Sequence, residues 1–128
     1  MRRPIGSGRR HPLADSFHER ATQELKRGVL QVAVLALLER RTYGYDLLRV
    51  LGERGFAAEE GTLYPVLRRL EGEGLLTSMW DTSGSRPRKY YESTDTGRAA
   101  LSALSSEWAR VDTSLRSVLS ESENGHDE

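Results

Sequence analysis

The chain has 128 residues, of which 37% are hydrophobic and 30% charged, and its 19 basic residues balance 19 acidic ones. This composition suits one soluble domain with an appended element, and the length is sufficient for a single core. The absence of cysteine from the sequence excludes disulfide scaffolds, thiolate zinc sites and cysteine nucleophiles, and fits the reducing cytoplasm. No apolar run approaches the ~20 residues of a membrane span, and no secretory signal follows the N-terminal arginines.

The two ends of the chain carry opposite charge. Residues 1–20 contain five arginines against two acidic residues, whereas the stretch after Leu119 contains four acidic residues and no lysine or arginine. Residues 1–15 are rich in proline, glycine and arginine without periodicity, which predicts a disordered basic arm. This arm either embraces nucleic acid or is only a solvated tail. Residues 120–128 are predicted to form a disordered acidic tail.

Two helices are expected in the first half of the chain. The first begins at about Ser16 and is best defined over residues 24–40. Within it, "GVLQVAVLALL" (residues 28–38) is apolar on nearly all sides, so it needs cover from more than one partner. The second spans residues 42–55, where Leu47, Leu48 and Leu51 share one face and Gly55 marks the end.

A third helix is expected over residues 59–73, "EEGTLYPVLRRLEGE". At about 100° per residue, four apolar side chains form one buried stripe: Leu63, Val66, Leu67 and Leu70. The remaining surface presents hydroxyl groups, a proline and two arginines: Thr62, Tyr64, Pro65, Arg68 and Arg69. A helix that only fills a core has no use for such a surface, so a binding face is indicated.

Pro65 leaves two possible starts for this helix. With Thr62 as the cap, Pro65 lies in the first turn, where its missing N–H costs nothing. With a start at Glu59, Pro65 is interior and kinks the helix. The sequence does not choose between them.

A β-hairpin and a long helix complete the chain. "LLTSMW" and "RKYYEST" are β-rich runs joined by "DTSGSRPR", which predicts a two-stranded hairpin with Arg86, Arg88 and Lys89 near its tip. Thr94 or Asp95 then caps a helix over residues 95–119. The fold is therefore expected to be mainly α with a small β-hairpin. Residues 16–94 would form a winged helix-turn-helix, with residues 59–73 as the recognition helix.

This arrangement predicts binding to double-stranded DNA. A recognition helix enters the major groove, where arginine is the commonest specific reader of guanine. Thr62 and Tyr64 would contact the DNA backbone, and Arg68 and Arg69 would reach bases or phosphates. The three basic residues of the hairpin would contact phosphates or the minor groove. The alternative for each of these groups is a solvated basic surface.

The last helix carries a regular apolar stripe. Its members recur at alternating steps of three and four residues: Leu101, Leu104, Trp108, Val111, Leu115 and Val118. Such a heptad seam is typical of a helix that pairs with another helix, and a small winged helix offers little surface to cover it. We expect a homodimer, with packing inside one chain as the alternative.

Four segments together resemble the PadR-like transcriptional regulators: "YGYDLL", "GTLYPVLRRLEGEGLL", "RPRKYY" and "TDTGR". The resemblance covers roughly residues 24–119. It implies a homodimeric repressor with an N-terminal winged helix and a C-terminal dimerisation helix, released from DNA by a small molecule or another cue. With one C-terminal helix, the chain is similar to the short branch of the family.

The resemblance also raises expectations for individual residues. The family usually follows "KYY" with a basic residue and a leucine, but this chain has Glu92 and Ser93, so the wing is less cationic and one core side chain is lost. Short members of the family hold planar aromatic compounds between subunits. Trp108 fits that placement, and Asp112 could offer a carboxylate to a cationic ligand. The alternative is that Trp108 only fills the interface.

Other functional classes find little support in the sequence. No set of nucleophile, base and paired carboxylates indicates an enzyme, and the three histidines, His11, His18 and His126, form no ligand cluster. We therefore expect no metal and no cofactor. The rival interpretation is a winged helix used only to bind proteins, which would show no salt-dependent binding to duplex DNA.

Overall fold

The computed structural model describes residues 12–56 and 58–126, so most of the expected basic arm lies outside the described residues. The chain divides into two compact units, residues 1–31 and residues 32–128, and helix α1 (Pro12–Leu37) runs through both. In the first unit α1 begins at Pro12 rather than near Ser16. Proline suits this position because the first amide of a helix needs no partner inside it.

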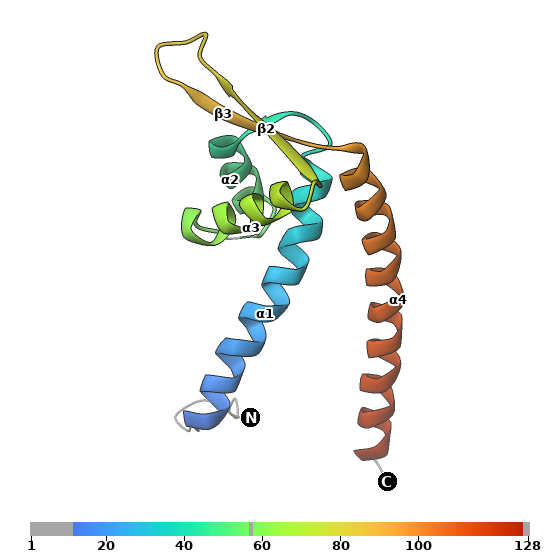
Figure 1. Ribbon diagram of the computed structural model, residues 1–128. Coiled ribbons are helices and arrows are strands. Elements are labelled where there is room, and N and C mark those ends of the chain that lie inside the picture. Colours follow the sequence, from blue (N-terminus) through green and yellow to red (C-terminus); the bar gives the residue numbers. More distant parts are fainter. Residues whose placement is uncertain (1–11, 57, 127–128) are drawn as a thin grey trace. The chain divides into compact units, whose positions relative to one another are not determined.

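The second unit contains the remaining elements (Figure 1). After the end of α1 come β1 (Thr42–Tyr43), α2 (Gly44–Glu53), α3 (Glu60–Gly72), β2 (Leu76–Asp81), β3 (Arg88–Ser93) and α4 (Asp95–His126). The expected order of three helices, a hairpin and a long helix is confirmed. Helix α4 continues past Leu119, so the part of the expected acidic tail up to His126 is helical. Residues 120–124 contain no proline or glycine to stop it.

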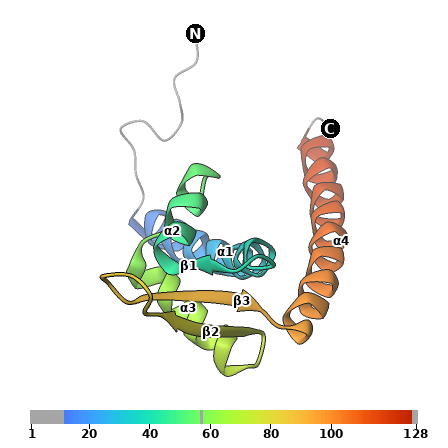
Figure 2. The ribbon, with the colours of Figure 1, turned by 90° about the horizontal axis from the view of Figure 1, so that it is seen from above.

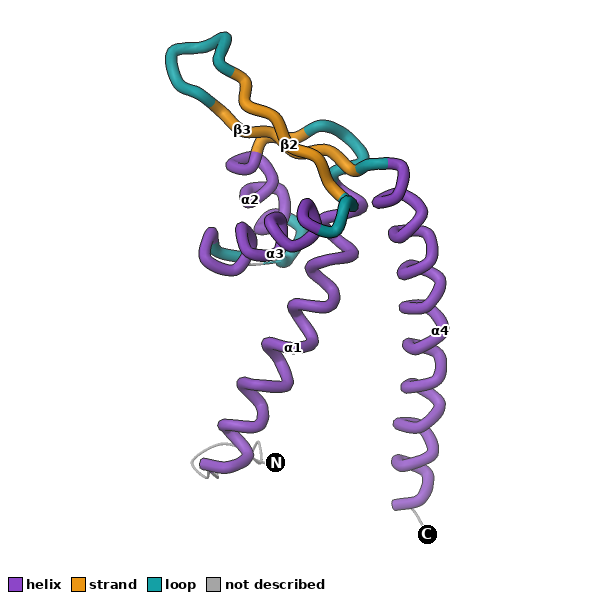
Figure 3. Tube along the Cα trace, in the orientation of Figure 1, coloured by secondary structure: helices purple, strands orange, loops and turns teal. Residues whose placement is uncertain are grey.

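The sheet has three strands, one more than the sequence predicted (Figure 3). The strand order is β1-β3-β2, with both pairs antiparallel. Strand β1 consists of Thr42 and Tyr43, which pair with Tyr91 and Tyr90 of β3. Two residues are too few to produce a periodic pattern, so only the pairing with β3 reveals this strand.

The core of the second unit lies among the helices and the inner face of the sheet. Leucines from three helices are fully buried: Leu35 and Leu38 from the end of α1 and its following turn, Leu47 and Leu51 from α2, and Leu63 and Leu67 from α3. Leu76 and Tyr91 bring the sheet into the same core, with 2% and 4% of their surface exposed. None of the helices in the described part of the chain combines the length and apolar character that a membrane span needs.

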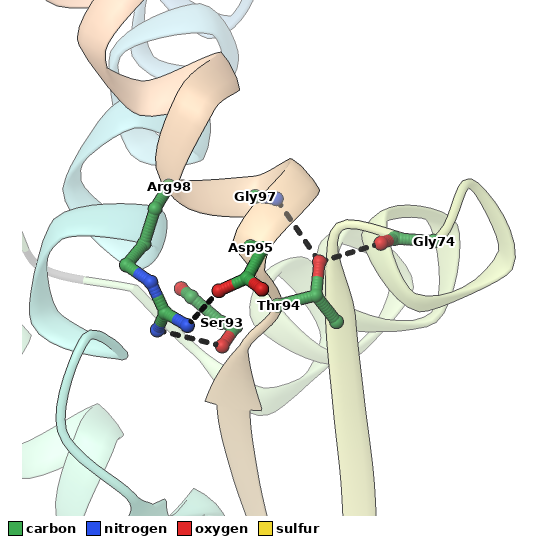
Figure 4. A network of polar contacts seen from close by, with 6 residues as sticks. All are labelled: Gly74, Ser93, Thr94, Asp95, Gly97 and Arg98. Atoms are coloured by element: carbon green, nitrogen blue, oxygen red, sulfur yellow. Dashed lines mark hydrogen bonds and ion pairs between the residues drawn. The ribbon is translucent and has the colours of Figure 1, made fainter.

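The start of α4 is fixed by a polar network around Thr94 (Figure 4). The Thr94 hydroxyl oxygen accepts a hydrogen bond from the Gly97 amide at 3.0 Å and donates its own proton to the Gly74 carbonyl at 2.7 Å. Thr94, and not Asp95, is therefore the helix cap. A Cβ atom on Gly97 would lie 2.1 Å from the Leu75 carbonyl oxygen, so only glycine allows α4 to begin this close to the turn before β2.

Ser93 stabilises the end of α1 instead of leaving a defect in the core. It is 3% exposed; its hydroxyl donates to the Leu35 carbonyl at 3.1 Å, and its amide donates to the Leu38 carbonyl at 2.8 Å. Helix C-termini leave carbonyls without partners, and the amide of Glu39 bonds to Ala36 rather than to Leu35. A serine at the expected leucine position therefore replaces apolar packing with one side-chain hydrogen bond to α1, beside the backbone bond of the same residue to the turn after α1.

Candidate nucleic-acid interface

Helix α3 buries the stripe that the sequence predicted. Leu63, Val66, Leu67 and Leu70 are its buried residues. The helix begins at Glu60, with Glu59 as a cap that makes no side-chain hydrogen bond, so the later start at Thr62 is wrong. Pro65 lies inside the helix and has no N–H to donate to the carbonyl four residues earlier.

The opposite face of α3 presents the predicted candidates. Thr62, Pro65, Arg68 and Arg69 are all exposed. Arg69 forms an ion pair with Glu73, with Nε and Oε2 3.7 Å apart. Within the described ranges Arg68 has no carboxylate partner and no hydrogen bond. Arg68 is therefore the arginine of this helix that can reach a ligand without breaking an existing pair.

Tyr64 lies against the start of α2 and is only partly exposed. Its hydroxyl oxygen is 2.9 Å, and its ring edge 3.3 Å, from the point where a Cβ atom on Gly44 would be. Burial, and then the charge of Glu60, raise the pKa of Tyr64, so its hydroxyl keeps its proton and can donate a hydrogen bond. The contact explains the glycine of "YGYDLL", because any larger residue would push Tyr64 aside.

The hairpin of β2 and β3 presents two chemically different faces, because directly paired residues of an antiparallel ladder share a face. The helix side carries Ser78, Trp80, Lys89 and Tyr91. Ser78 donates a hydrogen bond to Glu71 of α3, with the oxygens 2.6 Å apart, which fixes this side toward α3. The opposite side of the hairpin carries Met79, Asp81, Arg88 and Tyr90. The loop between the strands projects away from the helices (Figure 1).

Arg88 belongs to an aromatic cluster on the side of the sheet away from α3. Its guanidinium carbon lies 3.9 Å from the centre of the Tyr43 ring. The Tyr43 hydroxyl donates to the Asp81 carboxylate at 2.5 Å, and the Tyr90 ring meets Tyr43 edge-on at 5.9 Å. Tyr43 is the residue before α2, so the cluster braces the hairpin against the start of that helix.

Asp81 is held in its ionised form within this cluster. Hydrogen bonds from the Ser83 hydroxyl, the Tyr43 hydroxyl and the Ser83 amide lower its pKa from the usual 3.8 to about 2, and the charge of Arg88 acts in the same direction. A stacked arginine beside an ionised carboxylate is less available to phosphate than a free one. The structure thus separates Arg88, which the sequence grouped with Lys89, from the remaining cations of the hairpin.

Lys89 lies on the helix side of the sheet. Its ammonium nitrogen is 5.8 Å from the centre of the Trp80 ring and 5.6 Å from that of Tyr91, within the range of a cation–π contact. Arg86 is exposed in the hairpin loop. Sequence patterns do not indicate that Tyr43 and Asp81 would hold Arg88, because Tyr43 and Asp81 are 38 positions apart and aspartate is typical of turns.

The predicted seam of α4 is exposed in the single chain. Leu104, Trp108 and Val111 are 41%, 47% and 43% exposed, and Leu115 and Val118 are 53% and 63% exposed. Only Leu101, near the start of the helix, is half-buried. Asp112, the predicted carboxylate for a ligand, accepts two hydrogen bonds from Arg116 Nε, at 3.1 and 3.2 Å. No group of histidine and acidic side chains among the described residues could hold a metal ion.

Comparison with known proteins decides the family. The sequence model of the Transcriptional regulator PadR-like family matches residues 34–103. The chain belongs to this family. The matched PadR-like residues extend from the end of α1 to the first turns of α4, so they include α2, α3, the whole sheet and the Thr94 cap.

Individual proteins and a solved structure are also similar to this chain. The crystal structure of a PadR family transcriptional regulator from Eggerthella lenta has a TM-score of 0.76 and 39% identity, covering 85% of this chain and 97% of that one. A transcriptional regulator of Mycobacterium tuberculosis is 36% identical over 80 residues, which are 62% of this chain and 75% of that protein. The uncharacterized protein X of Lysinibacillus sphaericus is 39% identical over 93 residues, 69% of this chain and 85% of the relative. The predicted family and the winged-helix fold are confirmed, and members of this family are transcriptional regulators rather than enzymes.

Proposed function

We propose that this PadR-like regulator is a sequence-specific repressor that binds double-stranded DNA as a homodimer and is released by a small-molecule effector. The observation that carries DNA binding is the exposed guanidinium of Arg68 on α3, which has no carboxylate partner among the described residues and lies on the same side of the sheet as Lys89. An arginine without a carboxylate partner keeps its donors available for the paired acceptors of guanine.

The predicted interface residues then take separate roles. Arg68 reads a base, and Arg69, which is paired with Glu73, contributes to phosphate contact. Thr62, Tyr64 and Pro65 approach the DNA backbone near the start of α3. Arg86 and Lys89 contact phosphates, whereas Arg88 positions the wing through its stacking on Tyr43. A dimer would read an inverted repeat whose half-sites lie about one helical turn, or a simple multiple of it, apart.

A mobility-shift assay on the protein's own promoter region, at two salt concentrations, tests this proposal. Wild-type protein should bind more weakly at the higher salt concentration, because phosphate contacts release counterions. Arg68→Ala should reduce the preference for this duplex over a scrambled one by about 1–3 kcal/mol. Arg69→Ala is the matched control on the same helix and should change the preference less. Wild-type protein that binds no duplex at either salt concentration would instead favour the protein-interaction module.

The effector site is proposed between the α4 helices of two subunits. Trp108 is 47% exposed on the seam, and two copies related by a dyad would offer two flat faces to a planar aromatic compound. Asp112 would have to exchange Arg116 for a cationic group of the ligand. Release from DNA follows only if the ligand prefers a dimer whose recognition helices do not fit the operator.

Planar cationic dyes test the effector site. In a Trp80→Phe background, they should quench Trp108 fluorescence saturably and weaken operator binding, and both effects should disappear in Trp108→Leu. Unchanged dye affinity in a Trp108→Leu protein that is still dimeric would assign Trp108 to packing alone.

A further inference from the structure

Trp80 is a large aromatic residue that lies outside the buried core. It lies near the outer end of β2 and is 59% exposed. Keeping so much apolar surface in water forgoes the stabilisation that its burial would provide, and tryptophan is enriched where proteins bind partners. Its neighbour Met79 is equally exposed, at 60%, but lies on the opposite face of the same strand.

The pairing of the strands places Trp80 beside a lysine on the side of the recognition helix. Trp80 is paired with Lys89, and Ser78, two residues earlier on the same face, is bonded to Glu71 of α3. The Lys89 ammonium lies between two aromatic rings, 5.8 Å from that of Trp80 and 5.6 Å from that of Tyr91. An apolar ring and a cation are therefore presented together.

The carboxylate next to Trp80 in the sequence does not lie on this face, whereas Glu71 of α3 does, bonded to Ser78. Asp81 follows Trp80 directly, but it is bound by Tyr43 and Ser83 on the other face. Across the described stretches of chain Lys89 forms no ion pair with a carboxylate. Burial raises the pKa of Tyr91, as do the charges of Tyr64 and Glu71, and the charge of Arg68 opposes that rise. Lys89 therefore lies beside Tyr91 on the side of the sheet that faces α3, with Trp80 nearer the hairpin tip on the same side.

We propose that Trp80 and Lys89 form one contact with the sugar–phosphate backbone of duplex DNA. The indole packs on the apolar faces of the deoxyribose rings, and the ammonium binds the adjacent phosphate. This inference rests on the proposed DNA binding and adds an apolar component to it. Proteins that bind the minor groove also combine cations with apolar side chains, although there the apolar groups are frequently inserted between base steps.

The two halves of the contact respond differently to salt. A phosphate contact contributes to the slope of affinity against salt concentration, whereas an apolar contact releases no counterions. Lys89→Ala should therefore weaken binding and reduce the salt slope by about one. Trp80→Ala should weaken binding on the order of tenfold at every salt concentration, with the slope unchanged.

Met79→Ala is the matched control. It removes an equally exposed apolar side chain from the next position of the same strand, but from the face away from α3, so it should leave DNA affinity unchanged. The stabilities of Trp80→Ala and Met79→Ala are compared by thermal unfolding. Trp80→Phe, which keeps an aromatic ring, should recover most of the DNA affinity. The duplexes are the promoter region of the protein and a scrambled sequence of the same length, and Trp80→Ala should weaken both to a similar degree.

Fluorescence gives a direct measure of the contact. In a Trp108→Phe protein, Trp80 is the only tryptophan, and either duplex should shield it from acrylamide. If wild-type protein binds duplex DNA but Trp80→Ala binds as well as Met79→Ala, the wing contact is overturned while the proposed function stands. A loss of affinity in Trp80→Ala that is confined to the promoter sequence would also overturn the backbone contact, because the indole would then be contacting bases. Absence of any DNA binding by wild-type protein would instead overturn the proposed function.

Discussion

The winged helix and α4 use their apolar residues in opposite ways. In the winged helix, leucines such as Leu47, Leu63 and Leu67 are completely buried within one chain. In α4, every seam residue from Leu104 onward is at least 41% exposed, although the seam is as regular as any stripe in the domain. The difference teaches that a periodic apolar face identifies a packing surface without identifying its partner. The winged helix buries its apolar residues within one chain. Helix α4 follows β3 almost directly (Figure 2) and leaves its apolar stripe exposed, and we expect a second copy to cover this stripe.

The junction between the two regions should be the point most sensitive to substitution. Gly97→Ala places a Cβ atom 2.1 Å from a backbone oxygen of Leu75, so either α4 or the turn before β2 must move. We expect a loss of about 3 kcal/mol or more in the free energy of unfolding, measured by urea denaturation. Gly72→Ala is the control, because nothing lies within 4 Å of its Cβ position in α3. Similar stability of the two variants would show that the junction is not tightly packed.

Placing a charge on the seam should separate assembly from folding. Leu104→Glu puts a carboxylate on a stripe that we expect to be buried between subunits, so the protein should become monomeric and lose operator binding. Its thermal unfolding should remain cooperative, because the buried core of the winged helix is untouched. Light scattering at micromolar concentration provides the measurement, and Ser106→Glu, on the opposite face of α4, should remain dimeric. Wild-type protein that is itself a monomer under these conditions would contradict the dimer.

Removing one buried hydroxyl should weaken the winged helix by a smaller amount. Ser93→Ala leaves the Leu35 carbonyl without the proton donor that it has at 3.1 Å. The expected cost is about 1–3 kcal/mol of unfolding free energy. Ser85→Ala, an exposed serine of the hairpin loop, should cost almost nothing. Equal effects in denaturant titrations would mean that the Ser93 hydroxyl does not hold β3 to α1.

The smallest expected effect is the pH dependence of the stability that Asp81 contributes through its bonds in the hairpin. The folded-state pKa of Asp81, about 2, lies below its usual 3.8. Its contribution to stability is therefore complete above about pH 4 and is lost as the pH falls toward 2. The melting temperature of wild-type protein should exceed that of Asp81→Asn at pH 5, and the difference should shrink at pH 2.5. A constant difference over this range would mean that the bonds to Tyr43 and Ser83 do not stabilise the ionised form.

Local patterns were sufficient to predict much of the fold. The stripe of α3, the hairpin and the glycine ends of the helices all depend on residues a few positions apart, where periodicity acts directly, and capping preferences narrowed the cap of α4 to Thr94 or Asp95. The boundaries were less accurate. Helix α3 begins before Thr62, and α4 continues past Leu119, because packing and the absence of a stop signal decide where a helix ends.

The sequence by itself determined which residues face the core of α3, that the hairpin is basic, and that α4 carries a seam. Only the tertiary structure decided how the binding candidates divide between two faces: Arg88 stacks on Tyr43 while Lys89 joins Trp80 beside α3. Only the tertiary structure also shows that Tyr64 lies against Gly44 and that Ser93 donates a hydrogen bond to Leu35. The contacts of Arg88 with Tyr43, of Tyr64 with Gly44 and of Ser93 with Leu35 join residues 20 to 58 positions apart. Local propensity carries no information about such pairs, because they form only when distant elements pack around a common core.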